Sequence, residues 1–239
     1  MLALQFLGAA GTVTGSKHAL LHDGSATLID CGLYQGPKTL RLRNWEPLPI
    51  PPPEIDAVIV THAHIDHTGY LPRLVKDGFK GRVYATPATA DLLGVLLPDT
   101  GHLQEEEAAY ANKKGYSRHK PALPLFTERD AYKVLGHLER VEYGETVTQK
   151  SGLRFRYQDA GHILGSGICE TWADGVKVVF SGDLGREARR LQPADGLAGP
   201  LCATAQGYFR GARRAGLRDR AGGARSRGAG LGRDRPAIS

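Results

Sequence analysis

The chain has 239 residues, of which 41% are hydrophobic and 23% charged. This composition fits one large domain or two small ones and excludes a chain that is disordered throughout. Its three cysteines, Cys31, Cys169 and Cys202, are odd in number and far apart, which excludes a disulfide-stapled secreted domain and favours a cytoplasmic protein. No basic segment precedes the first apolar run and no apolar run is long enough to span a bilayer, so we expect neither a signal peptide nor a membrane span.

The net charge of +6 is unevenly distributed. Residues 1–184 contain 19 lysines and arginines against 21 acidic residues, whereas residues 185–239 contain 12 arginines against 4 acidic residues. The second segment also lacks a sustained helical or strand period. We therefore predict a folded domain over residues 1–186 and a poorly ordered Arg/Gly/Ala-rich tail over residues 187–239.

Two interpretations of the tail remain open. It could be an arginine-rich arm that binds nucleic acid, or a segment without an evolved role, such as the product of a shifted reading frame. We favour the second interpretation, because repeated RGG units are missing and aromatic residues are nearly absent from the tail.

The predicted elements begin with β-structure. Three short β-rich runs each end at a glycine, at residues 2–8, 18–24 and 26–32. A proline-rich connector then leads to DAVIVTH at residues 56–62. Its continuous apolar run predicts a strand that is buried on both faces.

Helices and strands alternate in the next part of the chain. A helix is predicted from Tyr70 to Asp77, a strand at residues 82–86, and a helix that starts near Pro87 with Thr86 as its N-cap. After a polar stretch comes a helix near Thr127 to His137. Four strand-like runs close the readable part, at residues 140–144, 154–161, 167–174 and 176–183. This order predicts an α/β fold.

The chemistry concentrates in the segment THAHIDH, just beyond the predicted buried strand. His62, His64, Asp66 and His67 lie within six positions there, and each is a zinc-type ligand. If the chain stays extended through His64, the first two imidazoles point to one side. A turn into the next helix can then present the other two residues to a neighbouring position. One short segment thus predicts ligands for two cations.

Two further residues have the same character, and each follows a predicted strand. His162 lies in DAGHILGSG and Asp183 in VVFSGDLG, where flanking glycines allow tight backbone paths. Each would be weak evidence alone. Together with the first cluster, they supply a third imidazole and another carboxylate.

These motifs resemble the metallo-β-lactamase superfamily and, within it, the β-CASP RNA-processing nucleases. The segments GAAGTVTGSKHALL, IDCGLYQG and GHILGS carry the likeness to that branch, and the resemblance covers about residues 2–186. It implies an αββα sandwich and a zinc-dependent ribonuclease that cleaves phosphodiester bonds with a metal-bound hydroxide. RNA is the implied partner. A homodimer is one candidate assembly, although the oligomeric state cannot be read from the sequence.

The resemblance also implies roles for individual residues. His62, His64 and His162 would hold the first zinc, Asp66 and His67 the second, and Asp183 would bridge both. Asp66 and Asp183 are the implied catalytic residues. Asp30 matches an acidic motif that orients a ligand without touching metal, although it could equally cap a turn. In the stretch YSRHK, Arg118 and His119 are candidates for contacting the substrate.

The chain also departs from the family pattern. The family continues after the S-G-D motif into an inserted domain and then returns to supply a last histidine, but no histidine follows His162. We therefore expect a sandwich that is incomplete at its C-terminus, a weak second zinc site and impaired cleavage. Two alternatives remain: a thioester or lactam hydrolase of the same fold, and a non-catalytic fragment that binds metal or RNA.

Overall fold

The computed structural model describes residues 1–117 and 119–185. The predicted tail and Arg118 lie outside these residues. Within the described part, no helix is both long and apolar enough to cross a membrane.

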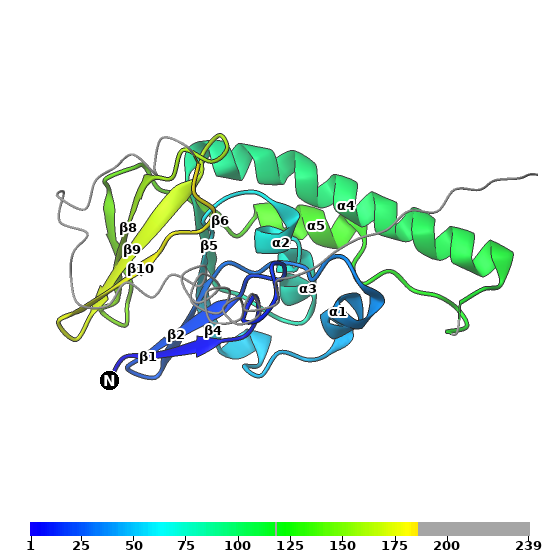
Figure 1. Ribbon diagram of the computed structural model, residues 1–239, viewed down its shortest axis with the longest axis horizontal. Helices are drawn as coiled ribbons and strands as arrows, with labels where there is room; N and C mark the ends of the chain where they lie inside the picture. Colours follow the sequence, from blue (N-terminus) through cyan, green and yellow to red (C-terminus); the bar gives the residue numbers. More distant parts are fainter. Residues whose placement is uncertain (118, 186–239) are drawn as a thin grey trace, which may run out of the picture.

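The described chain forms two sheets and one layer of helices (Figure 1). The first sheet has six strands in the order β1-β2-β3-β4-β5-β6. The pairs β1–β2 and β2–β3 are antiparallel, whereas the pairs from β3 to β6 are parallel. The strands are β1 (Ala3–Phe6), β2 (His18–His22), β3 (Ser25–Ile29), β4 (Ile55–Ile59), β5 (Arg82–Ala85) and β6 (Leu138–Arg140).

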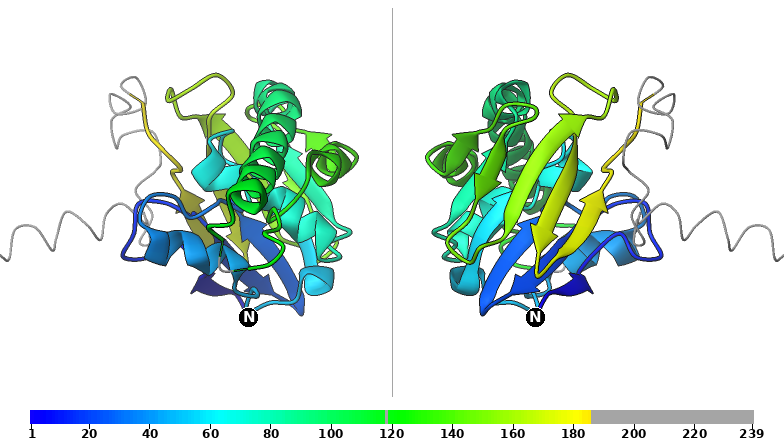
Figure 2. Two further views of the ribbon diagram at one scale, coloured as in Figure 1. Left: turned by 90° about the vertical axis from the view of Figure 1, so that its right-hand side faces the viewer. Right: turned by 90° about the vertical axis from the view of Figure 1, so that its left-hand side faces the viewer.

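The second sheet has four antiparallel strands in the order β10-β9-β8-β7. They are β7 (Thr146–Thr148), β8 (Arg154–Asp159), β9 (Gly167–Ala173) and β10 (Val176–Phe180). The right-hand view of Figure 2 looks onto this sheet, and no helix of the described residues covers its outer face. The described residues thus supply both sheets and one helical layer of the predicted αββα sandwich.

The helices lie on the other side of the first sheet (Figures 1 and 2). They are α1 (Lys38–Leu42), α2 (Ile65–Thr68), α3 (Leu71–Lys76), α4 (Pro87–Lys114) and α5 (Glu128–Leu135), with 3-10 turns at Arg43–Trp45 and Pro52–Glu54. Two of them, α4 and α5, have a threonine as their N-cap residue. The Thr86 side chain accepts from the backbone N–H of Thr89, and Thr127 forms a capping box with Asp130.

Strand β4 separates two apolar cores. Val58 packs in the core between the first sheet and the helices, with Leu71 and Leu93. Its neighbour Ile59 points the other way, into the core between the two sheets, with Phe155. The alternation of side chains along a strand explains this division. It confirms that the apolar run after the proline-rich connector is buried on both faces.

Two boundaries differ from the sequence prediction. The predicted strand at residues 140–144 is wrong: β6 ends at Arg140, and Tyr143 makes only an isolated bridge to Tyr157. The chain leaves the first sheet here and enters the second at β7, which was not predicted. Helix α4 also extends through much of the polar stretch to Lys114, because its exposed face needs no apolar residues.

Candidate metal centre

The segment between β4 and α2 brings the first two histidines together. Strand β4 ends at Ile59, and His64 is the N-cap residue of α2 with φ −58° and ψ 145°. Nε2 of His62 lies 3.0 Å from Nδ1 of His64. The predicted convergence of the two imidazoles is therefore present, although the strand itself ends before them.

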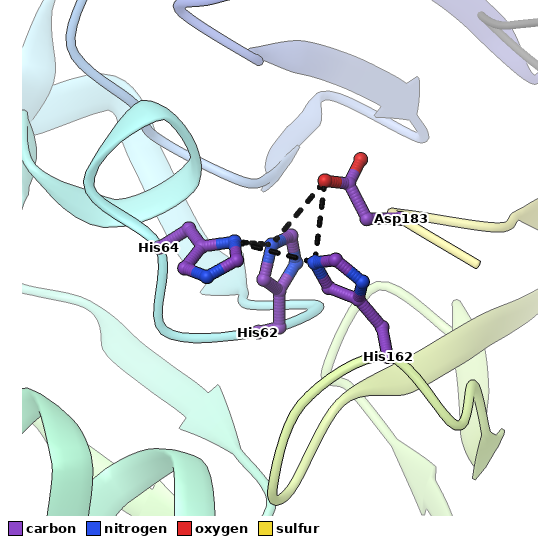
Figure 3. Close-up of side chains that lie close together, drawn as sticks. All are labelled: His62, His64, His162 and Asp183. Atoms are coloured by element: carbon purple, nitrogen blue, oxygen red, sulfur yellow. Dashed lines mark hydrogen bonds and ion pairs between the residues drawn. The ribbon is translucent and has the colours of Figure 1, made fainter. Parts of the chain in front are cut away.

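Two loops of the second sheet complete this group (Figure 3). His162 lies between β8 and β9, and its Nε2 is 3.3 Å from Nδ1 of His64. Asp183 follows β10, and its Oδ2 lies 3.5 Å from Nε2 of His162 and 3.9 Å from Nε2 of His62. One ligand atom from each of the four residues lies within 4.8 Å of the others.

These separations suit a metal ion. Atoms bound about 2.0–2.1 Å from a tetrahedral zinc lie about 3.3 Å from one another. Three imidazole nitrogens and one carboxylate oxygen are also a donor set that zinc accepts. The cluster of His62, His64, His162 and Asp183 therefore fits a divalent cation in both geometry and chemistry.

A second, looser set adjoins the first and shares Asp183. Oδ1 of Asp183 lies 3.6 Å from Nε2 of His67, and Oδ2 of Asp66 lies 3.9 Å from the same nitrogen. The two oxygens of Asp183 thus face different histidines, since Oδ2 faces the first cluster. This placement is compatible with a carboxylate that bridges two cations.

The buried Asp30 carboxylate holds the segment from Thr61 to His67 in place through hydrogen bonds. Its Oδ2 lies 2.7 Å from Nδ1 of His67, and its Oδ1 accepts from the backbone N–H of Thr61 at 2.8 Å. The Thr61 hydroxyl lies within hydrogen-bond distance of both carboxylate oxygens. The carboxylate therefore holds the His67 ring with its Nε2 turned toward Asp66 and Asp183, as in carboxylate–histidine–metal arrangements.

The ionisation of this group follows from burial and pairing. Burial by itself would raise the pKa of Asp30, but the adjacent His67 outweighs it and holds that pKa below its usual value. Burial would likewise lower the pKa of His67, and the Asp30 carboxylate reverses this and raises it. Burial and the neighbouring His67 lower the pKa of His62 to about 3. His62 is therefore neutral at pH 7, as a metal ligand must be.

The short helix α2 is held by the segment that follows β3 and by the segment that precedes β2. Its carbonyl groups at Ile65, Asp66 and His67 accept from the backbone N–H groups of Leu33, Ser16 and Cys31, at 3.0, 2.8 and 2.7 Å. Gly32 lies between these contacts, and a Cβ atom there would come within 1.6 Å of the Asp66 carbonyl oxygen. The glycine after Cys31 is thus required for the close approach of this segment to the one that carries Asp66 and His67.

A buried lysine lies behind the same segment. Lys17 is 2% exposed, and its Nζ donates to the carbonyl oxygen of Gly32. The ammonium group also lies 4.8 and 4.7 Å from the ring centroids of Tyr34 and Tyr70, where cation–π attraction offsets part of its desolvation. Burial lowers the pKa of Lys17 to about 8.

The His162 loop is fixed by long-range hydrogen bonds. The hydroxyl groups of Thr86 and Thr89 donate to the carbonyl oxygen of Gly165, at 2.6 and 2.9 Å. Gly167 donates to the carbonyl oxygen of Thr61 at 2.7 Å, which ties the second sheet to the ligand segment. Helix α4 therefore begins directly behind the loop that carries His162.

The six metal-ligand candidates predicted from the sequence lie together in the fold, whereas the residues that hold them in place were mostly not predicted. His62, His64, Asp66, His67, His162 and Asp183 meet in one place, with Asp30 beneath them. Thr61 and Ser16 were not predicted and Thr86 was predicted only as a helix cap, because a threonine or serine carries no motif of its own. Their position next to a ligand or a cap is the only signal in the sequence.

His119 lies elsewhere. It follows the C-terminal end of α4, which carries the chain away from α2 (Figure 1), and its backbone N–H donates to the Ser117 hydroxyl. Arg118 lies outside the described residues. A contact of either residue with substrate stays a prediction.

Comparisons with known proteins agree with this geometry. The model of the metallo-β-lactamase superfamily matches residues 15–220. A ribonuclease of Thermus thermophilus, TTHA0252, is 39% identical over 186 residues, which is 78% of this chain and 38% of that protein. The transcription termination factor FttA of Methanosarcina mazei is 37% identical over 188 residues, 77% of this chain and 28% of that protein.

A third relative is subunit 3 of the cleavage and polyadenylation specificity factor of Dictyostelium discoideum. It is 30% identical over 198 residues, which is 82% of this chain and 24% of that protein. This chain thus spans less than two fifths of the length of each of these relatives. The matched family model covers most of the chain and includes every residue of the metal cluster. The chain belongs to the metallo-β-lactamase superfamily, as its motifs predict.

Proposed function

We propose that this chain carries the metal centre of a zinc-dependent ribonuclease of the β-CASP type. The observation that carries the proposal is the convergence of His62, His64, His162 and Asp183, with the second carboxylate oxygen of Asp183 turned toward His67. The names of the relatives, among them a ribonuclease, favour RNA as the substrate.

Each residue has a defined task in this proposal. His62, His64 and His162 would hold one zinc, Asp66 and His67 would hold the second, and Asp183 would contribute to both. When bound, such a pair of cations supplies an activated water as nucleophile and stabilises negative charge on the phosphate oxygens. Asp30 keeps Nδ1 of His67 engaged, so that the other ring nitrogen is available to the metal.

The two positions differ in expected strength. The first offers three imidazole nitrogens and a carboxylate in a compact group. The second offers one imidazole and two carboxylates, at 3.6 and 3.9 Å from Nε2 of His67. We therefore expect the first position to bind zinc more tightly, and cleavage to be limited by occupancy of the second.

The deciding experiment measures zinc content and RNA cleavage on the same samples. The folded 239-residue chain, loaded with zinc and freed of excess metal, is compared with Asp183→Ala and with the control Asp99→Ala, which changes an exposed aspartate on α4. Cleavage of a labelled single-stranded RNA is followed under single-turnover conditions, with and without a chelator.

We expect the wild type and the control to hold zinc and to cleave RNA until chelator is added, and Asp183→Ala to lose both properties. Hydrolysis of a lactam or a thioester without RNA cleavage would assign the chain to a different hydrolase class. Zinc binding without turnover of any of these substrates would indicate a non-catalytic metal-binding chain. Either result would overturn the proposal.

A further inference from the structure

The far end of helix α4 carries an exposed group of aromatic and basic residues that the metal centre does not use. We call it the α4 tip, and it consists of Tyr110, Lys113, Lys114, Tyr116 and Lys120. The two tyrosines are 56% and 61% exposed, and all three lysines are exposed. Large exposed aromatic side chains gathered in one place mark interaction surfaces.

The tip is a fixed structure. Helix α4 ends at Gly115, whose φ of 69° turns the chain back. The Asn112 side chain then makes two hydrogen bonds with the backbone of Ala122. Its Nδ2 donates to the carbonyl oxygen at 2.9 Å, and its Oδ1 accepts from the N–H group at 2.7 Å. Further along, the backbone N–H of Leu125 donates to the Gln104 side chain. Tyr110 is therefore carried by α4 itself, and Tyr116 directly follows the Gly115 cap of that helix.

The two rings of the tip and the ammonium group of Lys114 lie close to one another. The ring centroids of Tyr110 and Tyr116 are 6.3 Å apart, and Nζ of Lys114 lies 5.8 Å from the Tyr110 ring. Between Glu107 and Glu128 the sequence contains four lysines and arginines and no acidic residue. The surface thus combines π-faces with a local excess of positive charge.

This combination points to a ligand with bases and phosphates. Aromatic rings beside cationic side chains bind single-stranded nucleic acid, since unpaired bases stack on the rings while lysines contact the phosphates. A protein partner would instead favour a larger apolar patch with few lysines at its centre. Duplex RNA offers no free base faces for stacking. The charge and the aromatic pair together favour a single strand.

We infer that the α4 tip binds single-stranded RNA at a distance from the metal centre. Helix α4 starts at the His162 loop and, with 28 residues, is about 42 Å long at about 1.5 Å per residue. The tip therefore anchors a segment of the strand remote from the bond that is cut. This inference rests on the proposed function, because it names where the same substrate is held.

The test is RNA affinity of the full chain in the presence of a chelator, so that no cleavage occurs. A labelled 20-nucleotide single-stranded RNA is titrated by fluorescence anisotropy. The variant Tyr110→Ala/Tyr116→Ala is expected to bind about fivefold or more weakly, since stacking is worth about 1 kcal/mol or more per base. The variant Tyr110→Phe/Tyr116→Phe keeps both rings and should bind as the wild type does.

The lysines are tested through the salt dependence of binding. The variant Lys113→Gln/Lys114→Gln/Lys120→Gln should lower the slope of log affinity against log salt by about 2, at about 0.7 per phosphate contact on a single strand. The control variant Lys38→Gln/Lys80→Gln/Lys150→Gln has the same net charge, but its lysines are exposed elsewhere. It should leave the slope close to that of the wild type.

Several results would overturn the inference. One is an unchanged affinity of the alanine pair, which would place RNA binding elsewhere, for example in the arginine-rich residues 187–239. Another is an equal loss of slope in both lysine variants. A third is unchanged RNA binding combined with altered self-association of the alanine pair in sedimentation, which would make the tip a protein interface. Because metal is absent, these outcomes do not depend on cleavage: tip-dependent binding without zinc-dependent cleavage would contradict only the proposed function.

Discussion

The two halves of the metal centre are held in different ways. His62 and His67 belong to one short segment and are 1% and 6% exposed, with Asp30 directly beneath them. His162 and Asp183 stand on loops of the second sheet, and their side chains are 25% and 31% exposed. The first half is thus fixed by buried contacts with the segments around β3, whereas the second half stands on partly exposed loops.

This difference predicts different responses to mutation. Changes beneath the buried half should cost folding stability together with metal affinity, because buried polar groups lose their partners. Changes in the exposed half should cost metal affinity and activity while the fold persists. The following variants test the comparison in order of decreasing expected effect.

Removal of the shared carboxylate should have the largest effect. Asp183→Ala is expected to lower zinc-dependent RNA cleavage by about 10³-fold or more, since both metal positions lose a ligand and metals supply several kcal/mol of stabilisation. The free energy of unfolding in urea without metal should change by less than about 0.5 kcal/mol, as for other partly exposed positions. A large loss of stability instead would show that this half is also structural.

Asp30→Ala should have the opposite profile. It leaves a buried imidazole without its carboxylate, and such losses cost about 3–5 kcal/mol. Asp30→Asn keeps the size of the side chain and is expected to weaken zinc binding by about 10- to 100-fold. Urea unfolding and zinc titration measure the two effects. Asp99→Asn, which changes an exposed aspartate on α4, is the control and should behave as the wild type.

The buried Lys17, which lies behind the buried half of the site, should make the stability of the fold depend on pH. Its pKa is lowered by burial to about 8 from 10.5, so the unfolded chain binds the proton more tightly than the folded chain. Between about pH 8 and 9 the free energy of unfolding should therefore rise with pH by up to about 1.4 kcal/mol per unit relative to Lys17→Met.

The rise in stability with pH should be measured below pH 9, because Cys31 acts in the opposite direction above it. Burial raises the pKa of its thiol to about 12, so from pH 9 upward this group favours the unfolded state. Urea unfolding of wild type and Lys17→Met at four pH values from 7.5 to 9 measures the difference. Parallel curves for the two proteins would contradict a buried charged lysine.

Thr86 should have the smallest effect and tests the exposed half. Thr86→Ala removes the N-cap of α4 and its hydrogen bond to Gly165, which is expected to cost about 1 kcal/mol and to weaken zinc binding. Thr127→Ala removes a comparable cap from α5, away from the metal centre. It should lose similar stability and keep the zinc affinity of the wild type. Equal zinc affinities in both variants would mean that α4 does not position His162.

Local patterns in the sequence account for much of this fold. The glycine-terminated β-runs, the double-sided apolar strand and the Thr86 cap are confirmed, because each depends on residues that are neighbours in the chain. The region after α5 was predicted less well. There β6 pairs with β5, which lies far before it in the sequence. The chain then leaves the first sheet and enters the second at β7, and no local sequence pattern predicts this change.

The sequence by itself determined the chemistry of the site: the H-x-H-x-D-H segment places four ligand-type residues on one strand-to-helix turn, where the first two imidazoles converge. Only the tertiary structure decided which distant residues join them. Asp183 and His162 reach the cluster because β8, β9 and β10 pack against the first sheet, and Asp30 reaches His67 because β3 and β4 are adjacent. Spacing along the chain cannot encode these contacts, since they arise from the pairing of strands and the burial of apolar faces.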